Sequence, residues 1–220
     1  MTFIGVPIDS VGRNGGTEHG PPALRELGLP AAVGGGDAGD LEVRIRGKTR
    51  DPETGVLAGA DVLATTATIH AAVADRIGAG ERPFLVGGCC AELPGALAGA
   101  RDALGRTVGL VHLDGHLDLY DGVTSPTGEA ADMPVSVALG LGPAGWVEAC
   151  GGASASPKRT ALVGFRDRPH PAARLAVADR RLARLLQPRE GSRAGLWESA
   201  SRGSRRLAPR SSPPVRSRSP

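Results

Sequence analysis

Short apolar runs alternate with amphipathic segments over the first three quarters of the chain, and polar or glycine residues follow each run. Apolar runs of strand length occur at residues 2–8, 83–88, 108–111 and 160–165. Between the first two runs, apolar residues recur at helical spacing from Ala60 to Ala79. Repeated strands and helices joined by glycine-rich turns predict a three-layer, doubly wound α/β fold with a mostly parallel sheet.

Three other segments carry weaker signals. Pro21 and Pro22 are typical of the first turn of a helix, so they predict a helix that begins there. Residues 40–46 alternate charged with apolar side chains, which predicts a half-exposed edge strand. Residues 89–92 are expected to lead into a helix that runs through Gly99 or beyond, and residues 125–140 predict a loop followed by a short helix.

The pattern stops after Phe165. Residues 166–220 contain 14 Arg together with many Ser and Pro, and they include no apolar run of strand length. Such a segment buries too little surface to order itself, so we expect one α/β domain over residues 1–165 and a disordered tail over 166–220. The sheet is then incomplete at its C-terminal end. Out-of-frame reading of GC-rich codons yields the same residue types, and a frameshift after Phe165 is one hypothesis for the tail.

Charge divides the chain at the same place. Residues 1–165 carry a net charge of −7 and residues 166–220 a net charge of +10, so the overall charge of +3 describes neither part. The basic tail could bind nucleic acid through phosphates, but an acidic domain would oppose that binding.

Cysteine usage and hydropathy indicate the compartment. The three cysteines, Cys89, Cys90 and Cys150, are an odd number and form no disulfide framework. We recognise neither a signal peptide at the N-terminus nor an apolar run near 18 residues. The expectation is a cytoplasmic protein that does not enter a membrane.

The candidate chemistry lies in residues 108–122, VGLVHLDGHLDLYDG, where Asp114, His116 and Asp118 follow an apolar run. On an extended chain these three side chains point the same way. Two carboxylates side by side are costly to bury unless a cation neutralises them, so the spacing predicts a metal site. The alternative is a polar strand end exposed to solvent.

Four segments, in order, resemble the ureohydrolase family, which includes arginase, agmatinase and formimidoylglutamase. Residues 114–118, DGHLD, are similar to the metal signature DAHxD of that family. The other segments are FIGVPIDSVGRNGGTEHGPPALRELGL at 3–29, GDAGDLEV at 36–43 and PFLVGGCCAE at 83–92. The resemblance covers roughly residues 3–165 and implies an arginase-like fold.

By this resemblance the catalytic residues are Asp114, His116 and Asp118. Asp114 would bridge two Mn²⁺ ions, Asp118 would bind one of them and His116 the other. A hydroxide held by the two ions would attack the guanidinium carbon, as binuclear sites can do. The resemblance thus implies a metal-dependent hydrolase that cleaves a C–N bond of a small linear amidine or guanidino substrate, and it implies a homo-oligomer.

The chain departs from the family pattern at three places. Cys89 and Cys90 replace Asp and His; Cys90 is either a ligand, which favours Zn²⁺, or a small buried apolar residue. Ala131 replaces a loop His, so the substrate-binding candidates are Thr127, Glu129 and Asp132. A second aspartate cluster of the family has no counterpart after Phe165. A catalytically inactive ureohydrolase-like protein is therefore the main alternative, and nucleic-acid binding through the tail is another.

Overall fold

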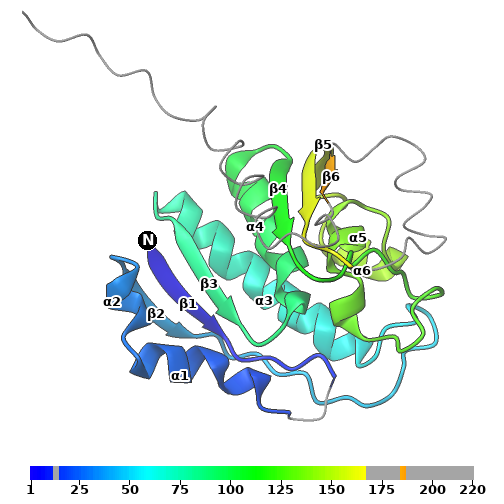
Figure 1. Cartoon of the computed structure of the whole chain (residues 1–220), viewed down its shortest axis with the longest axis horizontal. Helices are drawn as coiled ribbons and strands as arrows, with labels where there is room; N and C mark the ends of the chain where they lie inside the picture. The colour runs from blue at the N-terminus through cyan, green and yellow to red at the C-terminus, as the bar shows by residue number, and fades with distance from the viewer. Residues whose placement is uncertain (12–14, 167–183, 187–220) are drawn as a thin grey trace, which may run out of the picture.

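The computed structural model describes residues 1–11, 15–166 and 184–186. Strand β1 (Thr2–Val6) lies between β2 (Gly36–Asp40) and β3 (Pro83–Gly87), and all three are parallel (Figure 1). A second parallel sheet consists of β4 (Val108–Leu113), β5 (Ala155–Val163) and β6 (Arg184–Leu186), in that order. The predicted α/β fold with parallel strands is confirmed.

Helices cover the sheets, and neighbouring residues of β1 show how. Ile4 and Ala72 of α3 (Gly59–Gly78) line one groove. A Cβ on the next residue, Gly5, would lie 3.0 Å from Pro21 of α1 (Gly20–Glu26). Successive strand residues face opposite sides of a sheet, so α1 and α3 lie on opposite faces of the first sheet and form three layers.

The remaining helices connect the two sheets. The crossover from β3 to β4 runs through α4 (Leu93–Leu104), which packs along α3. The described part also contains three shorter helices, α2 (Leu29–Ala32), α5 (Pro134–Ala138) and α6 (Ala144–Ala149). Single 3₁₀ turns lie at Thr17–His19, Cys90–Glu92 and Ala130–Asp132.

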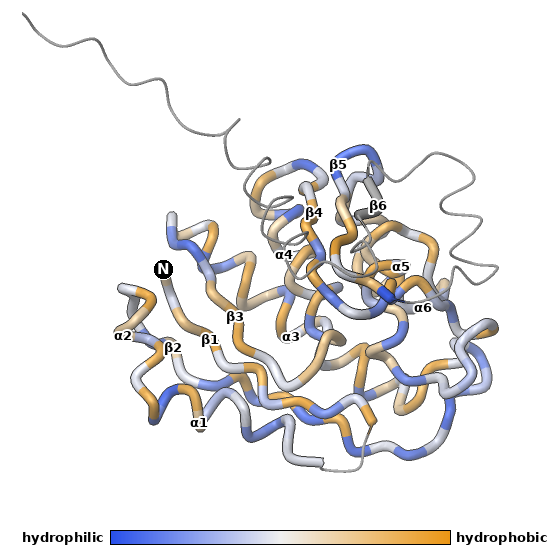
Figure 2. The backbone as a smooth tube through the Cα atoms, viewed as in Figure 1, coloured by the Kyte–Doolittle hydropathy of each residue, from blue (hydrophilic) through white to orange (hydrophobic). Residues whose placement is uncertain are grey.

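A largely aliphatic core lies between these layers. The apolar residues of β1 and β3 form continuous apolar stretches (Figure 2), and Phe3, Ile4 and Val6 of β1 are buried. The side chain of Trp146 is fully buried, and its Nε1–H donates a hydrogen bond to Thr66 Oγ1 at 2.9 Å. This bond satisfies the polar atom of the largest buried side chain and links α6 to α3.

The predicted edge strand over residues 40–46 is wrong. The strand lies earlier in the chain and ends at Asp40, after which the backbone turns, because the Val43 N–H donates to the Leu41 carbonyl. Val43 and Ile45 are nevertheless buried. The alternation of side chains therefore reports burial in an irregular segment and not pairing in a sheet.

Strand β6 lies within the segment 166–220, which the sequence predicts to be a disordered tail. The three residues of β6 pair with β5 as Ala161 with Arg184, Leu162 with Leu185 and Val163 with Leu186. The rest of the predicted tail, residues 167–183 and 187–220, lies outside the described residues. Among the described residues, no helix is long and apolar enough to span a membrane.

The two sheets are not joined by strand pairing in the described part of the chain. One edge of β3 and one edge of β4 are therefore without a neighbouring strand there, although α4 connects these two strands. On β4, Val111 and Leu113 are 67% and 71% exposed. The second sheet thus leaves an apolar face uncovered.

Candidate metal centre

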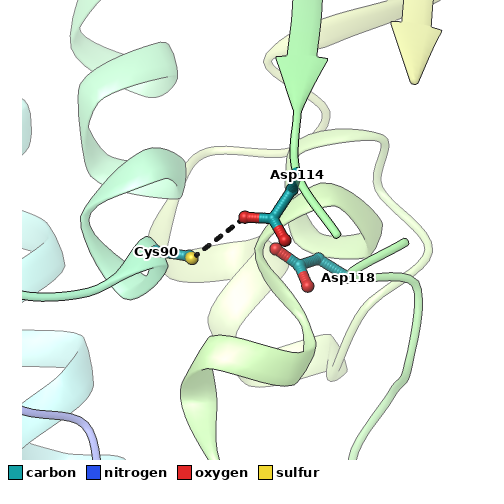
Figure 3. A group of neighbouring side chains, drawn as sticks. All are labelled: Cys90, Asp114 and Asp118. Atoms are coloured by element: carbon teal, nitrogen blue, oxygen red, sulfur yellow. Dashed lines mark hydrogen bonds between the residues drawn. The ribbon is translucent and has the colours of Figure 1, made fainter. Parts of the chain in front are cut away.

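The carboxyl ends of β3 and β4 bring Cys90, Asp114 and Asp118 together (Figure 3). Cys90 begins the turn after β3, and its thiol donates to Asp114 Oδ2 at 3.8 Å. One ligand atom of each residue lies within 4.8 Å of the other two. Thiolate and carboxylate are both metal ligands, so the cluster can hold a cation.

The backbone after β4 explains why Asp118 points back to Asp114. Asp114 Oδ1 accepts the His116 backbone N–H at 2.9 Å and so closes a turn. Asp118 has a φ of 51°, in the left-handed region that is strained for residues other than glycine. Its carbonyl accepts the backbone N–H groups of Val135 and Ser136 in α5 at 3.1 Å each. These bonds hold the reversed chain, and such strain is often found at functional sites.

His116 does not join this cluster. Strand β4 ends at Leu113, so the alternation of an extended chain does not continue through residues 114–118. The His116 side chain is 71% exposed, and its Nδ1 lies 3.3 Å from Asp114 Oδ1. The structure therefore brings together Asp114, Asp118 and Cys90 of the predicted ligands and leaves His116 at the rim.

The cluster is electrostatically unfavourable without a cation. The pKa of the Cys90 thiol is raised to about 12 by burial and, to a smaller extent, by the charges of Asp118 and Asp114. Burial likewise raises the pKa of Asp118, and the neighbouring His112 imidazole opposes this shift. A divalent cation would reverse both penalties, because it stabilises the ionised ligands.

His112 is a residue of the site that the motif reasoning missed. His112 Nε2 lies 3.3 Å from Asp118 Oδ2. Both atoms are buried, and among the described residues neither makes a hydrogen bond of good geometry. The available signal was the strand alternation, which places Leu110, His112 and Asp114 on one face.

The predicted substrate-binding residues lie in the loop that contacts the Cys90 turn. Asp132 Oδ2 accepts hydrogen bonds from Ser125 Oγ and Thr127 Oγ1, both at 2.8 Å. Thr127 Oγ1 also accepts the Glu129 backbone N–H at 3.0 Å. The loop therefore holds its own polar side chains in place beside the cluster, and none of the three joins it.

The donor set fits one ion better than two. Three protein ligands from three chain positions around one point are typical of a single catalytic Zn²⁺. Among the described residues, no further cluster of His, Cys, Asp or Glu supplies ligands for a second ion beside it. This donor set does not fit the pair of Mn²⁺ ions that the resemblance implies.

Comparison with known proteins identifies the family. The sequence profile described as "Arginase family" matches residues 1–211. The chain belongs to the arginase family. Its sequence is 30% identical to arginase from Brevibacillus brevis over 147 residues, which are 64% of this chain and 49% of that protein. It is 28% identical to arginase from Bacillus caldovelox over 174 residues, 76% of this chain and 58% of that one.

The fold agrees with this assignment. The native structure of Bacillus caldovelox arginase at pH 5.6 superposes with a TM-score of 0.80 at 22% identity, covering 91% of this chain and 69% of that one. The arginase-like fold and the family resemblance are confirmed. Homologues in this arginase family are metal-dependent hydrolases of C–N bonds. This chain spans about half the length of the curated relatives it matches.

Proposed function

We propose that this protein is a metal-dependent hydrolase that cleaves a C–N bond of a small guanidino or amidine compound. The observation that carries the proposal is the convergence of Cys90, Asp114 and Asp118 at the carboxyl ends of β3 and β4. Ligand sites in α/β folds lie outside the carboxyl ends of the parallel strands. Family membership supports the reaction class.

The cation we propose is a single Zn²⁺ or a similar thiophilic ion. Cys90 would supply the sulfur ligand and the two aspartates the oxygen ligands. When bound, such an ion lowers the pKa of water and polarises the group under attack. The two aspartates and the thiolate together more than neutralise the two positive charges of the ion in a partly buried site.

The adjoining loop is our proposed substrate side. Glu129 and Asp132 carry carboxylates that suit a cationic guanidinium, and Thr127 helps to fix the loop. Asp132 already accepts two hydroxyl hydrogen bonds, which would orient its carboxylate before substrate binds. We also propose a cytoplasmic location and a homo-oligomer, as the family resemblance implies.

The test is metal analysis combined with an assay of product release. The full chain would be stripped of metal, reloaded with Zn²⁺, Co²⁺ or Mn²⁺, and assayed for urea or ammonia release from several guanidino compounds. We expect about one thiophilic ion per chain and turnover that Asp114→Asn abolishes. Failure of every ion to bind would overturn the proposal.

A catalytically inactive member of the family is the second candidate. It is favoured by the position of His116, whose side chain is 71% exposed and lies outside the cluster of Cys90, Asp114 and Asp118. Stoichiometric metal binding without turnover on any guanidino compound would support this candidate over the first. Nucleic-acid binding through the basic tail depends mostly on residues outside the described part. If the full chain binds nucleic acid in this way, its affinity for nucleic acid should fall steeply as the salt concentration rises.

A further inference from the structure

The buried face of β4 leads directly to the metal centre. Val111 and Leu113 point outward from this strand, whereas Leu110 is buried and the side chain of His112 is 11% exposed. Asp114 follows His112 on the same inward face, because side chains of a strand alternate. His112 is therefore a polar residue on an apolar face, one pleat before a candidate ligand.

The chain reversal at Asp118 supplies an acidic neighbour for this histidine. It returns Asp118 Oδ2 to 3.3 Å from His112 Nε2. Asp118 is only 4% exposed, and its Oδ2 has no hydrogen-bond partner among the described residues. An unpartnered buried carboxylate oxygen is costly, so this arrangement needs a compensating interaction.

We propose that His112 is a positioning residue, whose Nε2–H holds Asp118 Oδ2 so that the other carboxylate oxygen binds the cation. This inference rests on the metal site proposed above. The N···O separation of 3.3 Å is longer than a good charge-assisted hydrogen bond, and we expect it to shorten when the cation is bound. Partners of this kind orient metal ligands, and their loss costs about 10- to 100-fold in metal affinity.

The competing explanation is an ordinary ion pair that stabilises the fold. The chain offers a matched example in His70 of α3, whose Nε2 lies 2.9 Å from Asp102 Oδ2 of α4. That pair lies outside the cluster of candidate ligands. A purely structural role predicts that His112 and His70 variants change stability alone, whereas a positioning role predicts a change in metal affinity that only His112 variants show.

The test titrates the metal-free full chain with Co²⁺ and follows its visible absorption bands and the thiolate-to-cobalt charge-transfer band. His112→Leu removes the donor and should weaken Co²⁺ binding by about 10- to 100-fold. His112→Gln places an amide N–H near the former Nε2 and should recover most of this loss. His70→Leu is the control, with Co²⁺ affinity expected to equal that of the unmodified chain.

Thermal unfolding of the metal-free variants completes the experiment. Should His112→Leu not fold, His112→Asn replaces it, because its amide is too short to reach Asp118. Equal Co²⁺ affinity in the unmodified chain and every His112 variant would overturn the role of His112 and leave the metal site intact. Absence of Co²⁺ binding by the unmodified chain would overturn both. Equal losses in the Leu and Gln variants, without rescue, would also contradict the positioning role.

Discussion

At the scale of single residues, Cys90 is the proposed ligand that would set the metal preference of the site. It stands where the family resemblance has a histidine, and its sulfur lies 3.8 Å from Asp114 Oδ2. Soft thiolate ligands favour Zn²⁺ and Cu⁺, whereas carboxylates and water suit Mn²⁺. One side chain therefore separates this chain from the metal preference that its family membership suggests.

The substitution Cys90→His tests this preference. It removes the only sulfur of the cluster and should lower the ratio of Zn²⁺ to Mn²⁺ affinity by at least about tenfold, because a softer ligand is exchanged for a borderline one. Competition between the two ions, read by metal analysis after dialysis, measures that ratio. Cys89→Ser is the control, since Cys89 lies next to Cys90 and outside the cluster. An unchanged ratio in Cys90→His would show that the sulfur does not bind the ion.

The sequence predicts those residues of the candidate site whose type and position are typical of metal ligands. Asp114 and Asp118 stood out because two carboxylates follow an apolar run. The role of His116 was expected from an extended chain, and the turn at residues 114–118 removes that geometry. Strand alternation places His112 on the same face as Asp114, but its contact with Asp118 could not be predicted from spacing, because it depends on a chain reversal held by hydrogen bonds from α5.

At the scale of elements, helix α3 organises the irregular segment that precedes it. Asp61 in its first turn accepts the backbone N–H groups of Arg46 and Gly47 on Oδ2, at 2.7 and 2.9 Å. These bonds satisfy backbone groups that a strand would otherwise have paired. The sequence suggested a strand at residues 40–46, since periodicity reports which side chains are buried but not where their backbone hydrogen bonds go.

Replacement of Asp61 gives a stability difference that depends on pH. The backbone hydrogen bonds from Arg46 and Gly47 lower the pKa of the Asp61 carboxyl below its usual value. The contribution of the Asp61 carboxylate to the free energy of unfolding is therefore fully present above its unfolded-state pKa. It is lost as the pH falls through the lower folded-state pKa. Asp61→Asn should reduce the free energy of unfolding by about 1 kcal/mol at pH 7 and by less in acid.

Urea denaturation at pH 7 and near pH 3 would measure that difference. Asp75→Asn, in the C-terminal half of the same helix, is the control for removing one negative charge. If the loss of unfolding free energy in Asp61→Asn is the same at both pH values, the two backbone hydrogen bonds do not depend on the charge of the Asp61 carboxylate, and the prediction is contradicted.

The contact of α3 with α4 depends on glycine. A Cβ at Gly99 would lie 2.4 Å from the His70 carbonyl oxygen, closer than atoms can approach. Gly99→Ala should therefore lower the free energy of unfolding by about 1–3 kcal/mol, as overpacking does. At Gly78 of α3 an added Cβ meets nothing within 4 Å, so Gly78→Ala should be neutral or stabilising by up to about 1 kcal/mol. Thermal unfolding of both variants measures this difference in stability. Equal melting temperatures of Gly99→Ala and Gly78→Ala would contradict the prediction.

At the scale of the whole molecule, the described chain holds two parallel sheets with an unpaired strand edge on each. The parallel strands and their crossovers were predictable, because buried strands and amphipathic helices alternate along residues 2–165. The separation into two sheets was not predicted, because the sequence pattern indicated a single sheet that is incomplete at its C-terminal end. Pairing between distant strands depends on residues far apart in the chain, which the periodicity of a single segment does not report.

Open edges and an uncovered apolar face make self-association the expected behaviour of this chain at high concentration. Val111 lies on the exposed face of β4 beside an unpaired edge, so a charge there should oppose association. Val111→Lys should therefore keep the protein in its smallest species at concentrations where the unmodified chain forms larger ones. Light scattering coupled to size-exclusion chromatography measures this. Val123, a 92% exposed residue outside any strand, offers the control Val123→Lys. Identical association of both variants would show that net charge, and not the β4 face, controls it.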